Sequence, residues 1–255
     1  MRPPIAFVGA GPGDPELITL KGARLLAAAD LVVHAGSLVH PDLLKHCRAG
    51  AALIDSAALD LQAITAAMVE AWRSGSVVVR LHSGDSSIYG ATVEQTKILD
   101  SAGVPWEIVP GVSSFQAAAA LLGVELTLPG VSQSVILTRA EGRSTPMPEG
   151  ESLARLGASR ATLCLFLSAG LAKKIEQDLI PHYGADCPVA VVVRATWPDQ
   201  QILRCRLDGL DLCLKEAKVT KTAMIIVGKV LLKEGEASKL YDKAFTHSYR
   251  RGQAD

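Results

Sequence analysis

Residues 76–90 read SVVVRLHSGDSSIYG, a β-branched apolar segment that runs into a glycine, an acid and two serines. A short run of valines bounded by turn residues is typical of a buried strand in a parallel sheet. In open α/β sheets, ligands bind in the crevice beyond the carboxyl ends of such strands. We therefore expect a small molecule to bind at residues 82–87. Gly84 permits close backbone approach there, and Ser83, Asp85 and Ser86 offer hydroxyl and carboxylate partners.

On either side of this stretch, the pattern predicts strands that alternate with helices. The expected strands are 5–8, 31–34, 52–54, 76–82 and 106–109, and the expected helices are 17–29, 41–47, 61–74, 92–102 and 115–122. In the first of these helices, Leu17, Leu20, Leu25 and Leu26 are the expected core positions. Five strands alternating with helices indicate a doubly wound α/β fold.

The segment 126–130, LTLPG, interrupts this alternation and marks a domain boundary. Beyond it we expect further strands and a helix, at 134–139, 162–167, 171–179 (the helix), 189–193, 201–205 and 223–227. The polar segment 141–150 is expected to be a loop. The predicted organisation is an N-terminal α/β domain at 1–128, a C-terminal α/β domain at 129–236 and a charged tail at 237–255.

Bulk composition excludes several classes of function. The 255 residues hold 26 Lys and Arg against 26 Asp and Glu, so no net charge attracts nucleic acid or a membrane surface. No apolar run approaches the roughly 20 residues that span a bilayer. The absence of C-x-x-C pairs and of a signal peptide favours a reduced, cytoplasmic location. The cysteines are Cys47, Cys164, Cys187, Cys205 and Cys213.

The turn after the first expected strand, Gly9-Ala10-Gly11-Pro12-Gly13-Asp14, partly matches a dinucleotide-binding fingerprint. That pattern requires a third glycine at position 14, where Asp14 stands, and an acid after the second strand, which is absent. Classical NAD binding is therefore disfavoured, and a plain tight turn is the alternative. His34, His40 and His46 lie six residues apart, so no helical face gathers them and no metal site is expected.

Two further turns follow expected strands. Residues 110–114, PGVSS, come after the strand 106–109, and residues 195–200, ATWPDQ, come after the strand 189–193. Trp197 lies before a proline in a loop, which suggests either a wall of a binding site or core filling. If the strands are parallel, the turns converge on one edge and form a cleft site for a small polar organic ligand. The residue chemistry by itself does not name a reaction.

The ordered motifs resemble a known family, the tetrapyrrole methylases. The resemblance is carried by Val8 to Thr19 (VGAGPGDPELIT), Ser83-Gly84-Asp85 with Tyr89-Gly90, Pro110 to Ser114, and Ala223-Met224-Ile225-Ile226. Other stretches are similar to the branch of the family that methylates precursors of cobalamin: 34–39, 165–168, 195–199, 238–242 and 245–247. Two residues depart from the family pattern, since Ser86 replaces a usual proline and His34 a common tyrosine.

The resemblance implies an S-adenosylmethionine-dependent C-methyltransferase, with two α/β domains, a ligand cleft between them and a homodimeric assembly. By position, it implies cofactor contacts in which Leu167 and Ala223 flank the adenine. The implied cofactor-binding residues are Pro12, Ser83, Gly84, Asp85, Ile88, Ser113, Ser114, Leu167, Ala195, Ala223 and Met224. The implied partner is a small-molecule tetrapyrrole, without nucleic acid or membrane.

Asp14 is the candidate catalytic residue, because related family members carry an acid there as proton acceptor. The alternative is a carboxylate that caps the helix beginning at Pro15 or Glu16. The tetrapyrrole carries several carboxylates, for which arginine is the preferred partner. We expect at least two of Arg80, Arg139, Arg143 and Arg194 to line the cleft, and the loop 141–150 to act as a lid.

Three alternatives stay open at this point. One is a sister tetrapyrrole methylase that acts at another carbon, and another is a relative that methylates RNA or protein. The third is a nucleotide-binding sensor that uses the same cleft without turnover. The sequence does not determine whether the tetrapyrrole is metal-free or holds cobalt.

Overall fold

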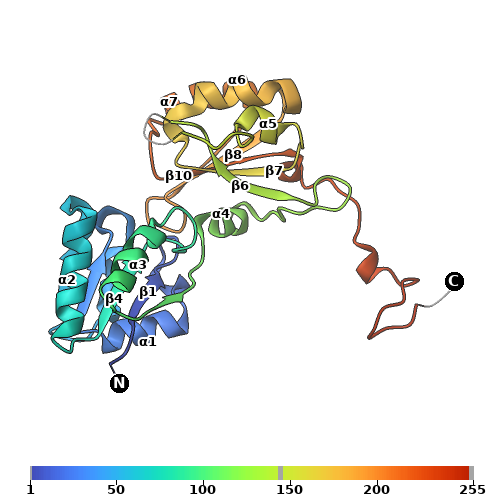
Figure 1. Cartoon of the computed structure of the whole chain (residues 1–255). Coiled ribbons are helices and arrows are strands. Elements are labelled where there is room, and N and C mark those ends of the chain that lie inside the picture. Colours follow the sequence, from blue (N-terminus) through green and yellow to red (C-terminus); the bar gives the residue numbers. More distant parts are fainter. Residues whose placement is uncertain (1, 143–145, 253–255) are drawn as a thin grey trace. The chain divides into compact units, whose positions relative to one another are not determined.

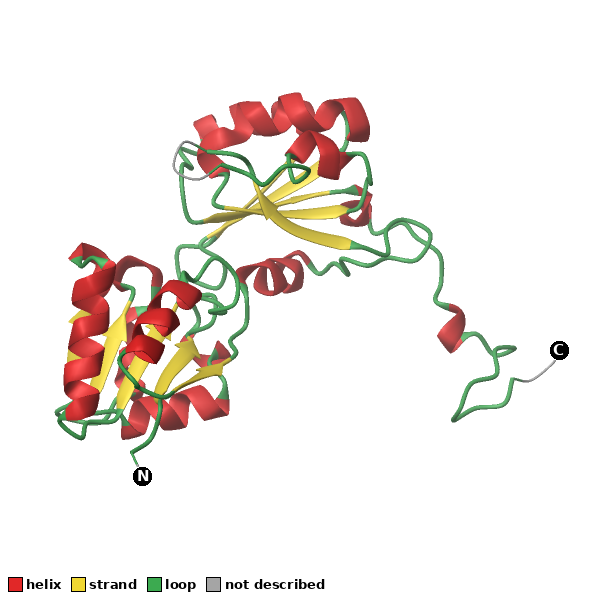
Figure 2. Ribbon diagram, in the orientation of Figure 1, coloured by secondary structure: helices red, strands yellow, loops and turns green. Residues whose placement is uncertain are grey.

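The computed structural model describes residues 2–142 and 146–252, and the chain divides into two compact units. The first unit comprises Met1–Ala117 and Arg194–Gln200, and the second comprises Ala118–Val193 and Gln201–Asp255. Each unit contains one five-stranded sheet with helices beside it, as Figure 2 shows in yellow and red. The expected class of two α/β domains is confirmed. The units change over near Ala117, whereas the sequence suggested a boundary at 128/129.

The sheet of the first unit is entirely parallel, with the strand order β3-β2-β4-β1-β5. Its strands, labelled in part in Figure 1, are β1 (Ile5–Gly9), β2 (Leu31–His34), β3 (Ala52–Asp55), β4 (Val78–His82) and β5 (Trp106–Val109). Its helices are α1 (Leu20–Ala28), α2 (Leu61–Arg73) and α3 (Thr92–Ser101). Short 3-10 segments lie at Pro15–Leu17, Gly36–Leu38, Pro41–His46 and Ser56–Ala58. The doubly wound pattern expected from the sequence is therefore present.

Successive residues of each strand pack into two different cores, one on each face of this sheet. Val8 and Leu81 pack with Leu26 of α1, whereas Phe7 packs with Met68 of α2 and Leu99 of α3. Successive side chains of a strand point to opposite faces, so a continuous apolar strand needs helices on both sides. This is the reason that β4 opens on two consecutive valines, with Val78 in one core and Val79 in the other.

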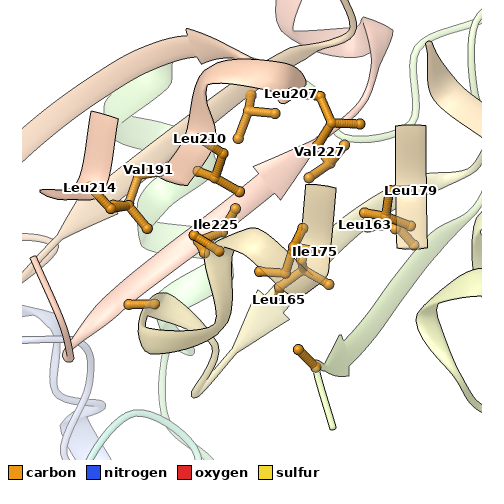
Figure 3. Close-up of a cluster of buried hydrophobic side chains, with 14 of the residues drawn as sticks. Leu163, Leu165, Ile175, Leu179, Val191, Leu207, Leu210, Leu214, Ile225 and Val227 are labelled. Carbon is orange, nitrogen blue, oxygen red and sulfur yellow. The ribbon is translucent and has the colours of Figure 1, made fainter. Parts of the chain in front are cut away.

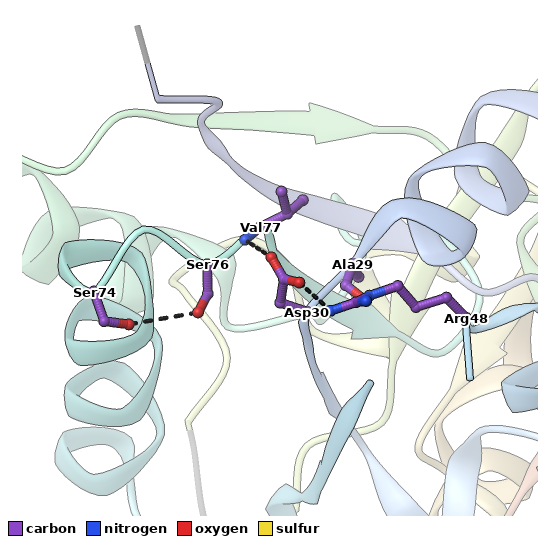
Figure 4. A network of polar contacts seen from close by, with 6 residues as sticks. All are labelled: Ala29, Asp30, Arg48, Ser74, Ser76 and Val77. Atoms are coloured by element: carbon purple, nitrogen blue, oxygen red, sulfur yellow. Dashed lines mark hydrogen bonds and ion pairs between the residues drawn. The ribbon is translucent and has the colours of Figure 1, made fainter. Parts of the chain in front are cut away.

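The amino-terminal side of β4 is fixed by a polar network around Asp30 (Figure 4). Asp30 Oδ2 accepts a hydrogen bond of 2.7 Å from the Val77 N–H, and Asp30 Oδ1 pairs with the Arg48 guanidinium. The Arg48 Nε donates to the carbonyl of Ala29 at 3.0 Å. The network holds the start of β4 beside the start of β2, at the end of the strands opposite to the turns that follow them.

The second unit has a mixed sheet with the order β6-β7-β10-β8-β9. β6 and β7 are parallel, and β10 runs antiparallel to both β7 and β8. The strands are β6 (Val135–Arg139), β7 (Thr162–Phe166), β8 (Pro188–Val193), β9 (Gln201–Arg206) and β10 (Ala223–Val227). The helices are α5 (Leu153–Gly157), α6 (Ala172–Tyr183) and α7 (Leu210–Glu216), while α4 (Ser114–Leu122) contains the change-over between units. Short 3-10 segments lie at Ala169–Leu171, Leu207–Gly209, Lys229–Leu232 and Lys239–Tyr241.

One face of this sheet forms a large apolar core with α6 and α7 (Figure 3). Ile225 and Leu165 from neighbouring strands pack with Ile175 of α6 and Leu210 of α7, and all four side chains are fully buried. The core therefore covers one face of the second sheet with the two helices. Neither α5 nor α7 was expected from the sequence.

One expected core position is wrong. Leu26 of α1 is completely buried, but Leu20 is 83% exposed. The cause is that α1 begins at Leu20, with Thr19 as the N-cap whose side chain accepts from the Gly22 N–H. Residues 15–17 form a separate 3-10 turn, so Leu20 does not continue the apolar stripe of the helix.

Candidate active site

Three of the turns singled out in the sequence lie side by side on one edge of the first unit. They follow β1, β4 and β5, which are neighbours in the parallel order β4-β1-β5. The turn after β1 and the turn after β4 are joined directly, because Gly84 N donates to Gly11 O at 2.8 Å and Gly11 N donates to Gly84 O at 3.2 Å. Convergence of the turns at the carboxyl edge, expected for parallel strands, is therefore confirmed for these three.

Glycines make this close approach possible. A Cβ on Gly9 would lie 2.6 Å from Gly111 Cα, and a Cβ on Gly111 would lie 2.3 Å from the carbonyl oxygen of Gly84. Both distances are shorter than any real Cβ contact, so the three backbones touch only because side chains are absent. Gly84 itself adopts a positive φ of 62°. The three turns thus meet backbone to backbone at this edge of the sheet, and we call this junction of Gly9, Gly84 and Gly111 the cradle.

Asp85 braces two of the turns. Its Oδ2 accepts from the Gly111 N–H at 2.8 Å, and its Oδ1 accepts from the N–H of Ser87 at 2.8 Å and from the Ser87 hydroxyl. Partial burial raises the pKa of Asp85, but these hydrogen bonds outweigh it and the net pKa lies below the usual value. The carboxylate is therefore charged at neutral pH, and it connects the turn after β4 to the turn after β5.

The third turn leads straight into a helix. Ser113 is buried, and α4 begins at Ser114. The Ser113 N–H donates to the side-chain oxygen of Gln116 at 3.0 Å. A Cβ on Gly84 would lie 3.9 Å from Ser113 Cα and 4.0 Å from Ser114 N, so both serines stand beside the cradle.

Residues 194–200 belong to the same unit and hold the turn after β1. The Asp14 N–H donates to Thr196 Oγ1 at 2.9 Å, and the Trp197 indole N–H donates to the Pro12 carbonyl at 3.1 Å. Ala195, a predicted cofactor contact, is buried in this loop. Sequence reasoning missed Thr196 and left the role of Trp197 undecided. The unusual Trp-Pro pair in a loop was the only signal.

The Asp14 side chain is engaged as a helix cap. Its Oδ1 accepts from the Glu16 N–H at 2.9 Å, at the start of the 3-10 segment Pro15–Leu17. The capping alternative expected from the sequence is thus confirmed, while the catalytic role stays a prediction. Within the described residues the second carboxylate oxygen makes no hydrogen bond, so it can accept one from a ligand.

A buried polar group lies beneath the turn after β4. Arg80 is 5% exposed, and its Nε donates to Gln95 Oε1 of α3 at 3.0 Å while Nη1 donates to the Val33 carbonyl at 3.2 Å. Burial lowers the pKa of Arg80 to about 10, so the guanidinium remains charged. His82 is equally buried. Burial first and the charge of Arg80 second lower its pKa to about 3.

Two buried side-chain atoms of this region, His82 Nε2 and Ser86 Oγ, have no hydrogen-bond partner within the described residues. Ser86 is almost fully buried, and its backbone carbonyl accepts a hydrogen bond from Thr92 Oγ1 at 2.7 Å. His34 Nδ1 has no partner either, and burial lowers the pKa of His34. Because the Arg80 guanidinium is buried and bonded to Gln95 and Val33, its charge lies inside the first unit and not at the surface.

The second unit has its own group of predicted residues at one edge of its sheet. β7 ends at Phe166, directly before Leu167, and β10 begins at Ala223, so the antiparallel register brings Leu167 and Ala223 to the same edge. Arg139, the last residue of β6, pairs with Phe166 there. Leu167 is 73% exposed and adopts a positive φ of 53°, which is uncommon for a leucine. Met224 follows inside the strand and is buried.

The remaining predicted residues lie as follows. Ile88 is half-buried in the turn after β4, and Arg194 lies in the first unit with its Nε donating to Asp199 Oδ1 at 2.7 Å. Arg143 lies outside the described residues, together with part of the proposed lid 141–150.

Within the described residues, no group of three His, Cys, Asp or Glu side chains could hold a metal ion. No helix among them is long and apolar enough to cross a membrane.

Comparison with known proteins identifies similar chains. The family model described as Tetrapyrrole (Corrin/Porphyrin) Methylases matches residues 4–211. The precorrin-4 C(11)-methyltransferase of Pseudomonas aeruginosa is 50% identical over 250 residues, which cover 98% of this chain and 99% of that protein. A solved cobalt precorrin-4 methyltransferase of cobalamin biosynthesis has a TM-score of 0.87 and 46% identity, covering 89% of this chain and 95% of that one.

A more distant solved structure includes a ligand. The uroporphyrin-III C-methyltransferase from Thermus thermophilus, complexed with S-adenosylhomocysteine, has a TM-score of 0.75 and 29% identity, covering 92% of this chain and 96% of that one.

Proposed function

The chain belongs to the tetrapyrrole methylases, and we propose that it methylates C11 of precorrin-4, or of cobalt-precorrin-4, in cobalamin biosynthesis. It is an S-adenosylmethionine-dependent methyltransferase. The observation that carries this function is 50% identity to a precorrin-4 C(11)-methyltransferase over 98% of the chain. The physical counterpart is the edge of the first unit, where three turns form a glycine-lined cradle.

The residues of the first unit fit the methyl donor. Its nucleoside and amino-acid parts need hydrogen-bonding groups and close backbone approach. Serine hydroxyls and main-chain groups stand beside the cradle, and the nearest atom to a Cβ on Gly84 would be 3.9 Å away. We propose that Pro12, Ser83, Gly84, Asp85, Ile88, Ser113, Ser114 and Ala195 contact the donor. Asp85 has most of its acceptor capacity committed to Gly111 and Ser87, so its main contribution is to keep the turns together. From the second unit, Leu167, Ala223 and Met224 are the proposed contacts.

Methyl transfer does not require a covalent bond between the protein and either reactant. The donor supplies a methyl group activated on a sulfonium, and the acceptor is an electron-rich carbon of the macrocycle. Bringing two bound reactants into in-line contact contributes on the order of 7–11 kcal/mol. The residues of this chain therefore act mainly by orientation and by excluding water. Asp14, with one carboxylate oxygen not used by the cap, is the proposed acceptor for the proton that the macrocycle loses.

The carboxylates of the tetrapyrrole need cationic partners. Arg194 is one candidate partner for a tetrapyrrole carboxylate. Its Nε is bonded to Asp199 and its guanidinium lies 3.9 Å from the centroid of the Trp197 ring, and these contacts hold the side chain in place. Its two Nη atoms make no hydrogen bond within the part of the chain that the structure describes, so they can donate to a carboxylate. Arg139, at the edge of the second sheet, is the other candidate. Arg80 is committed to Gln95 inside the first unit and is a poorer candidate.

The test is methyl transfer by the purified chain. Incubation with S-adenosylmethionine and either precorrin-4 or cobalt-precorrin-4 should give a product heavier by one methyl group, whose position is assigned by carbon NMR with a labelled donor. The faster substrate decides between the metal-free and the cobalt-bearing pathway. Methylation at another ring carbon would identify a sister enzyme. Binding of the donor without any transfer would favour a sensor and overturn the proposal.

A further inference from the structure

Trp197 makes several contacts that converge on the turn after β1. Its indole N–H donates to the Pro12 carbonyl at 3.1 Å. Its ring edge lies where a side chain at position 13 would be, since a Cβ on Gly13 would be 2.3 Å from Trp197 Cδ1 and 2.5 Å from Nε1. The centroid of the His40 imidazole lies 4.8 Å from the centroid of the Trp197 ring, although the two residues are far apart in the sequence. The ring is therefore held against the turn by several independent contacts.

The loop that carries Trp197 is itself tightly constrained. Arg194 and Thr196 adopt positive φ angles of 47° and 66°, which non-glycine residues rarely do. The Thr196 N–H donates to Gln200 Oε1 at 2.9 Å, and the Trp197 N–H donates to the Arg194 carbonyl at 3.0 Å. Such backbone persists only where surrounding interactions determine it, and it is concentrated at functional sites. The loop is thus a rigid support for the indole and not a mobile connection.

The turn after β1 depends on this support. Prolines at 12 and 15 lack an N–H, which removes two of the backbone donors that could anchor the turn locally. The carbonyl of Pro12 and the N–H of Asp14 are both satisfied from residues 194–200, by Trp197 and Thr196. On its other side, the turn is hydrogen-bonded through Gly11 to Gly84. Without the indole, Pro12 and Gly13 lose both a hydrogen bond and the surface they pack against.

We propose that Trp197 is a positioning residue for methyl transfer: it fixes the turn 11–14 so that Pro12 meets the donor and Asp14 faces the reacting carbon. The inference rests on the proposed function. Tryptophan alone combines a large flat ring with an N–H donor, which explains the residue type. A phenylalanine would cover Gly13 but would leave the Pro12 carbonyl unpaired.

The chain contains a matched control in Trp72 of α2. Its indole N–H donates to a proline carbonyl, that of Pro3, at 2.8 Å, and the Arg2 guanidinium lies 5.4 Å from its ring centroid. The chemistry is the same as at Trp197, but Pro3 precedes β1, so the contact lies at the opposite end of the strand from the cradle. Loss of either tryptophan removes similar structural interactions, and only one of them adjoins the cradle.

The experiment compares Trp197→Phe and Trp197→Ala with Trp72→Phe and Trp72→Ala. For each variant, the melting temperature, the Kd for S-adenosylhomocysteine by calorimetry, and kcat and KM for methyl transfer are measured. Both alanine variants should lower the melting temperature. Only Trp197→Ala should weaken S-adenosylhomocysteine binding, by about tenfold, and lower kcat, with Trp197→Phe intermediate. Wild-type binding and turnover in Trp197→Ala, at a melting temperature lowered as in Trp72→Ala, would overturn the inference.

A second measurement keeps the test independent of the stability of Trp197→Ala. Gly13→Ala places a methyl group against the indole and should weaken donor binding in the wild-type background. In the Trp197→Phe background, where the N–H edge is gone and the ring is smaller, the same substitution should cost less affinity. Equal costs in both backgrounds would contradict the inference. Failure of the wild-type chain to bind S-adenosylhomocysteine would instead overturn the proposed function, so the two failures are distinguishable.

Discussion

At the scale of single residues, Asp14 serves a structural role that can be separated from the proposed catalytic one. Asparagine is as good an N-cap as aspartate, since its carboxamide oxygen also accepts from the N–H of Glu16. Asp14→Asn should therefore keep the melting temperature within a few degrees, while turnover falls about 100-fold if the carboxylate takes the proton. Steady-state kinetics and thermal unfolding measure the two effects. Unchanged turnover in Asp14→Asn would leave only the cap.

His82 predicts how the stability of the protein depends on pH. Its pKa in the native state is about 3, whereas an unfolded histidine has a pKa of 6.5, so the unfolded chain binds a proton that the native chain excludes. The stabilisation is complete above pH 6.5 and is lost as the pH falls toward 3, with a slope of up to about 1.4 kcal/mol per pH unit. His82→Leu should remove this part of the slope in urea unfolding measured at a series of pH values.

The wild-type chain, unfolded in urea over the same series of pH values, serves as the reference. A His82→Leu variant whose stability falls with acid as steeply as the wild type would contradict the assignment to His82. Burial also lowers the pKa of His34, so the wild-type curve contains both contributions. The difference between the wild type and His82→Leu gives the contribution of His82 alone.

At the scale of secondary-structure elements, the close approach of the turns after β1, β4 and β5 depends on Gly111. In Gly111→Ala, the new methyl group would lie 2.3 Å from the Gly84 carbonyl and 2.7 Å from Gly9 Cα, so the turns must separate. We expect a loss of about 1–3 kcal/mol of stability from this overpacking, together with weaker donor binding. Gly209→Ala is the control, because nothing lies within 4 Å of its Cβ position. Equal donor affinity in the two variants would show that the cradle tolerates separation of the turns.

At the scale of the whole molecule, the prediction that remains to be tested is assembly. The family resemblance implies a homodimer, and closed two-fold dimers are the commonest soluble oligomers. Light scattering of the purified chain should therefore give twice the mass of one chain, independent of dilution over the range used for the assay. A mass equal to one chain with full methyl-transfer activity would exclude the dimer as a requirement for catalysis.

Much of the local structure could be predicted from the sequence. The strands 31–34, 106–109 and 223–227 match the observed ones residue for residue, and the helix 61–74 ends one residue late. These predictions succeeded because periodicity, β-branching and glycine or proline at the ends are local properties. Prediction from the sequence was wrong for the burial of Leu20 and did not find the helices α5 and α7. The N-cap at Thr19 sets where α1 begins, and α5 and α7 are short helices with few apolar residues.

The sequence by itself determined the elements, the turns with chemically useful residues, and through resemblance the family. Only the tertiary structure decided the partners: Asp85 with Gly111, Arg80 with Gln95, and Trp197 with Pro12, the last pair 185 residues apart. The reason is physical. A strand's period encodes which face it buries, but the order β4-β1-β5 and the path of residues 194–200 follow from packing of the whole chain, which no local pattern contains.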